Sequence, residues 1–408
     1  MDECVMNPKV RFKNNDGSSF GDYSSVAIGS LFSKIKAGGT PKSSCKEYYN
    51  GDIKFLSISD MTRTGKYVEK TEKNITEDGI SNSSAWIVPK GSVLLSMYAS
   101  YGKVCINNDE MATSQAILAM VPENNNAEYL YQLLCYLDES GFWDSYVKSG
   151  TQPNLSKGVV EKVRVFVPEL GEQQKIATFF RTLDAKIYIV RKKLTCLQKI
   201  NNRLVGDVMS GKIRFLMENG KSYPDWKCEK LGKSFSVKMC KRIFKDETLD
   251  VGDVPFYKIG TFGGEPDSYI TQEQFELYKT KYSYPSTGDT LISCSGTVGR
   301  CVVFDGSPSY FQDSNIVWLE SKESNFVYDK EYLTAVLKNL TWNELSSSTI
   351  KRIYSKDLLE KEWFVPCMEE QQAISKFIFE LNDRVALENK KLSSLIKLKK
   401  SFMQQMFV

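Results

Sequence analysis

Few side chains in this sequence have the types and spacing that catalysis requires. It contains ten cysteines and no histidine, which excludes histidine-based acid–base chemistry, Ser-His-Asp and Cys-His nucleophiles, and imidazole zinc sites. The closest cysteines, Cys294 and Cys301, do not have the spacing of a zinc knuckle. Asp225 and Glu229 have nuclease-like types, but they lie too close together and the Glu-x-Lys spacing is wrong. We therefore expect no catalytic residue and no metal site.

Phosphate-binding and methyltransferase motifs are also absent from the sequence. It has no Gly-x-x-x-x-Gly-Lys-Ser/Thr loop and no Asn-Pro-Pro-aromatic tetrapeptide. The length of 408 residues, with 41% hydrophobic and 25% charged residues, is typical of a globular protein of two or three domains. The net charge is only +4, so any nucleic-acid surface must be local. Scattered cysteines and the lack of a long apolar run predict a cytoplasmic protein without a membrane partner.

One short motif occurs twice, each time at the start of a helical pattern. Phe-Val-Pro lies at residues 166–168 and again at 364–366, and Glu-Gln-Gln follows at 172–174 and 370–372. Each pair is separated by the same 198 positions (364 − 166). Proline suits the first turn of a helix, because it fixes φ and the first N–H groups lack partners there anyway. We therefore predict a long helix after each proline.

Apolar residues follow each motif in alternating steps of four and three. Such a repeat, sustained over several heptads, is typical of a coiled-coil seam. A helix of about 35 residues would be roughly 50 Å long. The predicted seam consists of Ile176, Phe180, Leu183, Ile187, Val190, Leu194, Leu197, Asn201 and Leu204, and of Ile374, Ile378, Leu381, Val385, Glu388, Leu392, Leu395, Lys399 and Phe402.

The segments before the two helices are repeats of each other as well. Lys-x-Arg-Phe occurs at residues 9–12 and 212–215, and Gly-x-x-Leu-x-Ser occurs at 91–96 and 288–293. The chain is therefore two copies of one module, a globular part followed by a long helix. The predicted parts are a first globular domain at 1–165, a first helix at 166–210, a second globular domain at 211–362 and a second helix at 363–408.

The globular parts have the pattern of an α+β fold with a partly antiparallel sheet. Short alternating or β-branched runs predict strands, for example at 53–58, 93–97 and 302–304, and helical patterns occur at 128–137 and 331–340. The loops have diverged: Gly-Gly-Thr-Pro at 38–41 aligns with Lys-Arg-Ile-Phe at 241–244. A shared framework with different loops indicates two similar domains that contact different things.

This order of modules resembles the specificity subunit of type I restriction–modification enzymes. The resemblance covers essentially the full chain, and its most specific parts are the two proline and Glu-Gln-Gln motifs and the two Gly-x-x-Leu-x-Ser runs. Tyr-Pro-Asp-Trp at 223–226 is also similar to the family, whereas the first half has a weaker match, Phe-Gly-Asp-Tyr at 20–23.

The resemblance implies a non-catalytic subunit that reads double-stranded DNA. Each globular half would be a target recognition domain for one half of a split, asymmetric site. The two helices would pair as an antiparallel coiled coil about a pseudo-twofold axis, set the half-site spacing and dock two adenine methyltransferase subunits. Restriction subunits would add ATP-driven translocation and cleavage. S-adenosylmethionine, ATP and Mg would bind to these partners and not to this chain.

Under this resemblance the polar loop residues become candidates for DNA contact, since arginine, lysine and small polar side chains read bases and phosphates. The loop after each Gly-x-x-Leu-x-Ser run is the first set, the segment before each helix is the second, and the diverged loop is the third. A solvated loop without a base contact is the alternative at every position. The candidates are Ser100, Tyr101, Lys103, Ser295, Thr297 and Arg300; Thr151, Gln152, Asn154, Thr349, Lys351 and Arg352; and Lys36, Thr40, Lys42, Lys241 and Arg242.

If the helices pair antiparallel, the internal repeat predicts a register. Asn201 would face Glu388, and Val190 would face Lys399. Polar seam residues lower stability but can specify register; alternatively, these three polar residues lie near solvent or a partner helix. A different class of function, a coiled-coil protein scaffold without DNA readout, is favoured slightly by the modest net charge and opposed by the family pattern.

Overall fold

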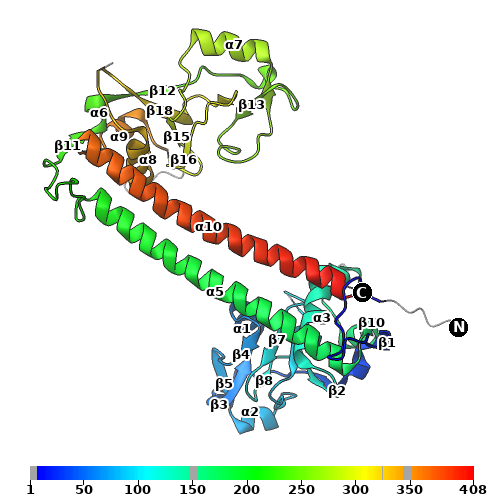
Figure 1. Ribbon diagram of the computed structural model, residues 1–408. Helices are drawn as coiled ribbons and strands as arrows, with labels where there is room; N and C mark the ends of the chain where they lie inside the picture. Colours follow the sequence, from blue (N-terminus) through cyan, green and yellow to red (C-terminus); the bar gives the residue numbers. More distant parts are fainter. Residues whose placement is uncertain (1–6, 99, 147–153, 324, 343–351) are drawn as a thin grey trace. The chain divides into compact units, whose positions relative to one another are not determined.

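The computed structural model describes residues 7–98, 100–146, 154–323, 325–342 and 352–408. The chain forms two compact units: unit 1 is Met1–Lys192 with Lys390–Val408, and unit 2 is Lys193–Asn389. Each unit therefore holds one globular domain and parts of both long helices. These helices are α5, Leu170–Met209, and α10, Met368–Met406 (Figure 1).

The first domain contains ten strands and four α-helices among its described residues. The strands are β1 Ser24–Ala27, β2 Phe32–Ala37, β3 Tyr49–Leu56, β4 Tyr67–Val68, β5 Lys73–Ile75, β6 Val93–Ser96, β7 Val104–Asn107, β8 Ala112–Thr113, β9 Ile117–Pro122 and β10 Arg164–Val167. The helices are α1 Ile58–Arg63, α2 Glu77–Ser81, α3 Ala127–Glu139 and α4 Lys157–Lys162, with short 3₁₀ turns at Ile28–Leu31, Lys46–Tyr48 and Phe142–Ser145.

The second domain has a matching set. Its strands are β11 Lys227–Lys230, β12 Phe235–Met239, β13 Val254–Tyr257, β14 Tyr269–Ile270, β15 Thr290–Ser293, β16 Cys301–Val303, β17 Tyr310–Phe311, β18 Ile316–Ser321 and β19 Glu362–Val365. Its helices are α6 Leu231–Ser234, α7 Gln272–Lys281, α8 Lys330–Asn339 and α9 Ser355–Leu359, with a 3₁₀ turn at Lys245–Glu247.

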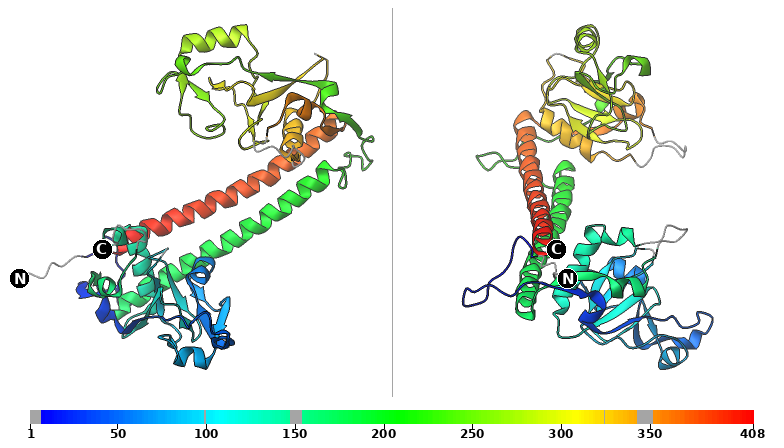
Figure 2. Two further views of the ribbon diagram at one scale, coloured as in Figure 1. Left: turned by 180° about the vertical axis from the view of Figure 1, so that it is seen from behind. Right: turned by 90° about the vertical axis from the view of Figure 1, so that its right-hand side faces the viewer.

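The strand pairing confirms the duplication and the α+β class. The first domain has a sheet of order β2-β9-β6-β7-β4, and the second has β12-β18-β15-β16, in which the first four strands match and pair antiparallel. Smaller sheets, β5-β3-β8 and β14-β13-β17, match in the same way, each with one parallel pair. Helices α3 and α8, both predicted, pack on β6–β7 and on β15–β16 (Figures 1 and 2).

One predicted strand is shorter than expected. The run at residues 53–58 ends as a strand at Leu56, because Ser57 caps helix α1. The Ser57 hydroxyl accepts a hydrogen bond from the backbone of Asp60, and the Asp60 side chain accepts one from Ser57 in return. This capping box satisfies two helix donors, so that the apolar Ile58 belongs to the helix.

The repeated Glu-Gln-Gln motif is a structural joint. Glu172 is fully buried and binds Arg11 of the Lys-x-Arg-Phe motif, with NH2 to Oε2 at 2.7 Å. Its copy Glu370 binds Arg214 at 2.8 Å. These bonds raise the pKa of both arginines above the ordinary value. The two repeated motifs are thus partners, which explains why they recur together.

The glutamine after each of these glutamates joins the helix to its domain. Gln173 accepts from the backbone N–H of Asn126, the cap of α3, and donates to the Pro168 carbonyl. Gln371 makes the same two bonds with Asp329 and Pro366. One amide side chain therefore ties three elements together: the strand before the long helix, the helix itself and the helix on the sheet.

Each domain core also receives the end of the other long helix. Met403 and Met406 at the C-terminal end of α10, and Phe407 just after it, belong to the core of the first domain. The ring centroids of Phe407 and Tyr136 are 5.5 Å apart. Val208 and Met209 at the end of α5 belong to the core of the second domain. Within each unit the two helix segments are antiparallel, as predicted.

None of the predicted seam residues is exposed. Eight are buried, namely Ile176, Phe180, Leu183, Val190, Leu194, Ile374, Ile378 and Glu388, and the other ten are partly buried. A partly buried stripe along a two-helix contact is what heptad spacing predicts.

The predicted register is wrong. In unit 2, Asn201 Nδ2 donates to Asn382 Oδ1 at 2.9 Å, and Glu388 pairs with Lys193. In unit 1, Lys399 pairs with Asp184 at 2.8 Å and not with the position of Val190. The displacement from the predicted register is six positions for Asn201–Asn382 and Lys399–Asp184 and eight for Lys193–Glu388, so it is close to one heptad. A shift of one heptad keeps every seam residue at the interface, so the helix pattern alone does not select the register.

Replacing Asn201 with leucine should raise the free energy of unfolding by about 1 kcal/mol. Asn201 Oδ1 is buried and has no hydrogen-bond partner among the described residues, whereas Asn382 is exposed and can bind water. The matched control is Asn202→Leu at an exposed neighbour. Chemical denaturation measures both variants, and a loss of stability in Asn201→Leu would contradict the seam assignment.

Candidate nucleic-acid interface

The loop after the Gly-x-x-Leu-x-Ser strand has the same hydrogen bonds in both domains. In the first, the Ser96 hydroxyl donates to the Ser100 carbonyl and accepts from the Lys103 N–H at 3.0 Å. In the second, the Ser293 hydroxyl donates to the Thr297 carbonyl and accepts from the Arg300 N–H at 2.9 Å. The serine of the motif therefore holds a six-residue loop closed.

A glycine in each loop is required by backbone conformation and by space. Gly102 and Gly299 have φ of +84° and +79°, a region that other residues rarely adopt. A Cβ atom at Gly102 would lie 1.9 Å from Asp138 Oδ1, and one at Gly299 would lie 2.3 Å from Trp342 Nε1. The loop of the first domain is therefore packed closely onto α3, and that of the second onto Trp342, which follows α8.

The predicted loop sets meet at one turn in each domain, which we call the central turn. All three sets bind it in the second domain, whereas in the first the segment before the long helix reaches it only through Met97. In the first domain the central turn is residues 114–116, between β8 and β9. Thr40 donates to Gln115, and Met97 N donates to the Ala116 carbonyl at 2.8 Å. Leu155 N then donates to the Met97 carbonyl at 2.9 Å, which attaches the segment before the long helix.

In the second domain the central turn is residues 312–315, between β17 and β18. Cys294 N donates to the Asn315 carbonyl at 2.7 Å, and Ile353 N donates to the Cys294 carbonyl at 2.8 Å, as in the first domain. Side chains from all three loop sets bind this turn: Arg242 to Asp313 at 2.9 Å, Ser295 to Asn315 at 2.8 Å and Arg352 to the Ser314 hydroxyl at 3.1 Å.

The central turn is one residue longer in the second domain. Three residues separate β8 from β9, whereas four separate β17 from β18. Ser314 takes a φ of +49° in the longer turn, a conformation that is uncommon outside glycine. Strand pairing places Ala37 opposite Leu118 and Met239 opposite Val317. Thr40 and Arg242, each three residues further on, therefore occupy equivalent positions. The alignment of 38–41 with 241–244 made from the sequence is wrong by one residue, because it follows the spacing of motifs and not the strand register.

Four of the candidate DNA-contact residues bind a central turn directly, namely Thr40, Arg242, Ser295 and Arg352. Of all the candidates that the structure describes, ten are exposed and three, Tyr101, Ser295 and Arg352, are partly buried. Thr151, Gln152, Thr349 and Lys351 lie outside the described residues. The exposed ones are Lys36, Thr40, Lys42, Ser100, Lys103, Asn154, Lys241, Arg242, Thr297 and Arg300.

Several candidates make bonds within their own domain. The Tyr101 hydroxyl donates to Asp144 at 2.8 Å, and this bond raises the pKa of Tyr101. Arg300 NH1 donates to the Phe262 carbonyl at 2.7 Å. Arg352 NH2 bonds to Ser314. These contacts give Tyr101, Arg300 and Arg352 a structural role, whatever else they bind.

Other candidates lie beside aromatic rings. Lys36 Nζ is 5.8 Å and its neighbour Lys34 is 4.1 Å from the centre of the Trp86 ring. Lys241 Nζ is 5.4 Å from the Tyr282 ring. Asn154 pairs with Tyr98 in an isolated β-bridge. Such cation–π contacts hold a charge at the surface.

Sequence reasoning missed the central turns themselves. Gln115 and Asp313 were not among the candidates, although each contacts a residue that was. The signal in the sequence was weak: a short polar segment between two short strands. The convergence of loops that lie about 75 residues apart in the chain depends on the sheet order, which local patterns do not specify.

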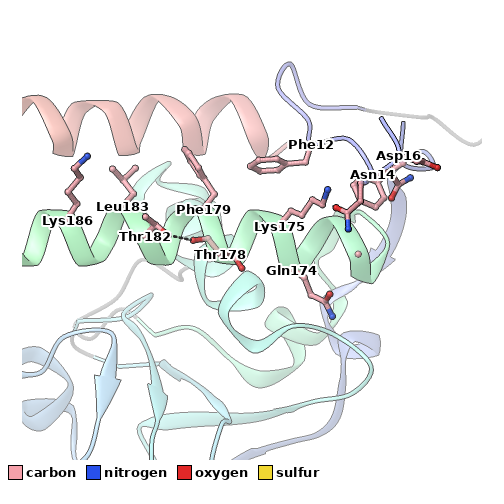
Figure 3. A pocket seen from close by; sticks show the side chains of 13 residues that line it. Phe12, Asn14, Asp16, Gln174, Lys175, Thr178, Phe179, Thr182, Leu183 and Lys186 are labelled. Atoms are coloured by element: carbon pink, nitrogen blue, oxygen red, sulfur yellow. Dashed lines mark hydrogen bonds between the residues drawn. The ribbon is translucent and has the colours of Figure 1, made fainter. Parts of the chain in front are cut away.

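A groove of about 1000 Å³ lies along the start of α5 in unit 1. Phe12, Phe20, Phe179 and Leu183 supply apolar walls, and Lys175 and Lys186 supply positive charge (Figure 3). Phe12 packs on Phe179 at 5.9 Å. In unit 2, Phe215 packs on Phe377 in the same way at 5.5 Å. The apolar walls of the groove in unit 1 fit a protein segment better than DNA.

Exposed aliphatic residues recur at matching positions of the long helices. Ile189 and Leu387, 198 positions apart, are 64% and 63% exposed, and Ile200 and Leu398, with the same separation, are 47% and 46% exposed. Unit 1 therefore carries Ile189 and Leu398, and unit 2 carries their copies. Exposed apolar residues that repeat at equivalent positions are candidates for a contact surface that occurs twice.

Two further observations concern metals and membranes. Among the residues the structure describes, no group of three cysteine, aspartate or glutamate side chains could hold a metal ion. In the same part of the chain, no helix combines the length and the apolar character needed to cross a membrane.

Comparison with known proteins finds one family domain in each half of the chain. The model of the type I restriction modification DNA specificity domain matches residues 21–199 and 223–397. S.HindORF215P of Haemophilus influenzae is 51% identical over 144 residues, which are 35% of this chain and 37% of that protein. The MjaIX specificity subunit of Methanocaldococcus jannaschii is 25% identical over 337 residues, which are 82% of this chain and 73% of that protein.

A solved structure shares the fold over the whole chain. The S subunit of a type I restriction–modification system from M. genitalium has a TM-score of 0.59 at 16% identity and covers 99% of both chains. The chain belongs to the type I restriction–modification DNA specificity family and is a specificity subunit with two target recognition domains. The family does not support the alternative of a protein scaffold without DNA readout.

Proposed function

We propose that this chain is the non-catalytic, DNA-reading subunit of a type I restriction–modification complex, and that each domain reads one half of a bipartite, asymmetric site in double-stranded DNA. One observation carries the proposal. The same backbone bonds hold the central turn in both domains, whereas the side chains on it differ. A fixed frame with exchanged polar side chains is what two readers of different base sequences require.

We assign the DNA contacts to the exposed candidates around each central turn. Lys36, Thr40, Lys42, Lys103 and Asn154 would serve the first half-site, with Ser100 and the undescribed Thr151 and Gln152. Lys241, Arg242, Thr297 and Arg300 would serve the second, with Ser295, Arg352 and the undescribed Thr349 and Lys351. Lysines bind phosphates and fix the position, while arginine and amide side chains distinguish bases.

The division into parts is a proposal as well: residues 1–165 and 211–362 are the readers, and 166–210 and 363–408 are the spacers between them. The helices of 40 and 39 residues are each about 60 Å long. Readers on one face of DNA need half-sites about one helical turn, or a multiple, apart. A rigid spacer therefore gives an unread gap of constant length.

The repeated aliphatic residues support docking of two like partners. Ile189 with Leu398 in unit 1 and Leu387 with Ile200 in unit 2 form equivalent sets. We assign these surfaces, and the groove of unit 1, to two adenine methyltransferase subunits in the cytoplasm. Restriction subunits would join the same complex. S-adenosylmethionine, ATP and Mg would bind to those partners.

A genome-wide map of adenine methylation tests the proposal. Cells that express this chain with its methyltransferase should show a split motif with an unread gap, and deletion of this chain should abolish it. Replacing residues 1–165 with the equivalent part of another specificity subunit should change one half of the motif only, because each domain reads separately. A motif that changed in both halves, or no methylation by a complex that assembles, would contradict the proposal.

A further inference from the structure

We propose that Asp313 is a positioning residue for Arg242, and that Arg242 selects a guanine in the half-site that the second domain reads. This inference rests on the proposed function and names a specificity-determining pair within it.

The geometry of the pair leaves the recognition end of the arginine available. Arg242 donates through Nε to Asp313 Oδ2 at 2.9 Å. The Arg242 side chain is 58% exposed, whereas Asp313 is 17% exposed. A bond through Nε does not use the four N–H groups on the terminal nitrogens. Those groups form the fork that binds O6 and N7 of guanine in the major groove.

The Asp313 carboxylate lowers the entropy that Arg242 loses when it binds DNA. A free arginine loses rotamer freedom when it contacts a base, and that loss reduces affinity. Asp313 is held in the central turn beside Ser314 and Asn315, which bind Arg352 and Ser295. An arginine attached to this turn is already partly ordered before DNA arrives.

The other two candidate arginines of the second domain are used differently. Arg300 donates NH1 to the Phe262 carbonyl, and Arg352 donates NH2 to Ser314. Each therefore uses an N–H group of a terminal nitrogen within the domain, so that neither has the fully free pair of terminal nitrogens that Arg242 has. Of these three arginines, Arg242 has the contact that suits base reading best.

The first domain has a side-chain contact at the equivalent position, but it is formed by different residue types. Thr40, equivalent in position to Arg242, donates to Gln115 of the first central turn. The backbone frame is retained and the pair of side chains is exchanged. A position that reads a different base in each half-site would diverge in this way, whereas a pair needed only for folding has no reason to.

The test is binding by the full chain, in complex with its methyltransferase, to DNA pools randomised at each half-site. Arg242→Ala should reduce the preference for guanine at one position of one half-site by roughly tenfold or more. Arg242→Lys should keep overall affinity without restoring that preference, because lysine lacks the fork. The neighbour Lys241→Ala is the matched control, which should weaken binding to all sequences equally and reduce the salt slope by about one.

Asp313→Ala should reduce the same preference while affinity for unrelated DNA stays equal or rises, since a negative charge is removed. The double variant should show no greater loss of preference than Arg242→Ala alone. Asp313→Asn, which keeps an acceptor oxygen, repeats the measurement if the alanine variant folds poorly, and it should show a smaller loss. Unchanged preference in both Asp313 variants would overturn the positioning role.

Two other results are distinguishable. A uniform loss of affinity in Arg242→Ala would mean a phosphate contact and would overturn the inference while leaving the proposed function intact. A wild-type complex without any sequence preference would contradict the proposed function itself.

Discussion

Replacing Glu370 with alanine should lower the free energy of unfolding by about 3–5 kcal/mol, the usual cost of removing one partner from a buried ion pair. Glu370 is fully buried. Its carboxylate accepts from Arg214 Nε at 3.1 Å, from Arg214 NH2 at 2.8 Å and from Trp226 Nε1 at 2.7 Å. The substitution leaves these donors without their acceptor. It also breaks the contact between α10 and the segment with Arg214 and Trp226, which leads into the second domain.

Urea denaturation followed by circular dichroism measures this effect. The control is Glu369→Ala, which removes the exposed neighbouring carboxylate on the same helical turn and should change stability by no more than about 0.5 kcal/mol. Glu370→Gln keeps the shape and one acceptor, and should fall between the two. Equal stability of Glu370→Ala and Glu369→Ala would show that the repeated motif does not hold the domain.

Replacing Gly38 with alanine should disrupt the central turn of the first domain. A Cβ atom there would lie 2.0 Å from the Thr113 carbonyl oxygen and 2.4 Å from that of Ser114. Both are backbone atoms, so the clash is not relieved by rotation of a side chain. Overpacking of this kind costs about 1–3 kcal/mol. We also expect DNA affinity to fall by roughly tenfold or more, because Thr40 and Gln115 would be displaced.

The control for this variant is Gly65→Ala in the same domain. Gly65 has no heavy atom within 4 Å of the position of a Cβ, so we expect a stability change within about 0.5 kcal/mol. Competition binding against DNA altered in one half-site or the other locates the defect. Loss of discrimination confined to the half-site of the first domain is the expected result, and equal loss in both halves would contradict it.

The second domain has a cysteine, Cys240, in place of Gly38. Strand pairing places Cys240 at the position equivalent to Gly38, where it is 2% exposed. The central turn of the second domain is also one residue longer. The length of the turn and the residue type beside it have changed together, which one sequence without the structure does not reveal.

Local patterns were sufficient for the helices. Heptad spacing predicted both seams, and none of those side chains is exposed, because apolar side chains at that spacing must be covered by a partner. The duplicated motifs predicted two similar α+β domains in the correct order. Asn201 shows where this reasoning ends: its place in the seam follows from spacing, but its partner Asn382 does not.

The sequence by itself thus determined the elements, their duplication and the family, since periodicity and repeated motifs are local properties of the chain. Only the tertiary structure decided which elements meet. The helix register is set by packing of the helix ends into the domain cores, where Phe407 and Val208 are buried. The proposed reading surface depends on sheet order, which brings Arg242, Ser295 and Arg352 to one turn. Contacts between distant segments depend on the whole fold, and no local spacing encodes them.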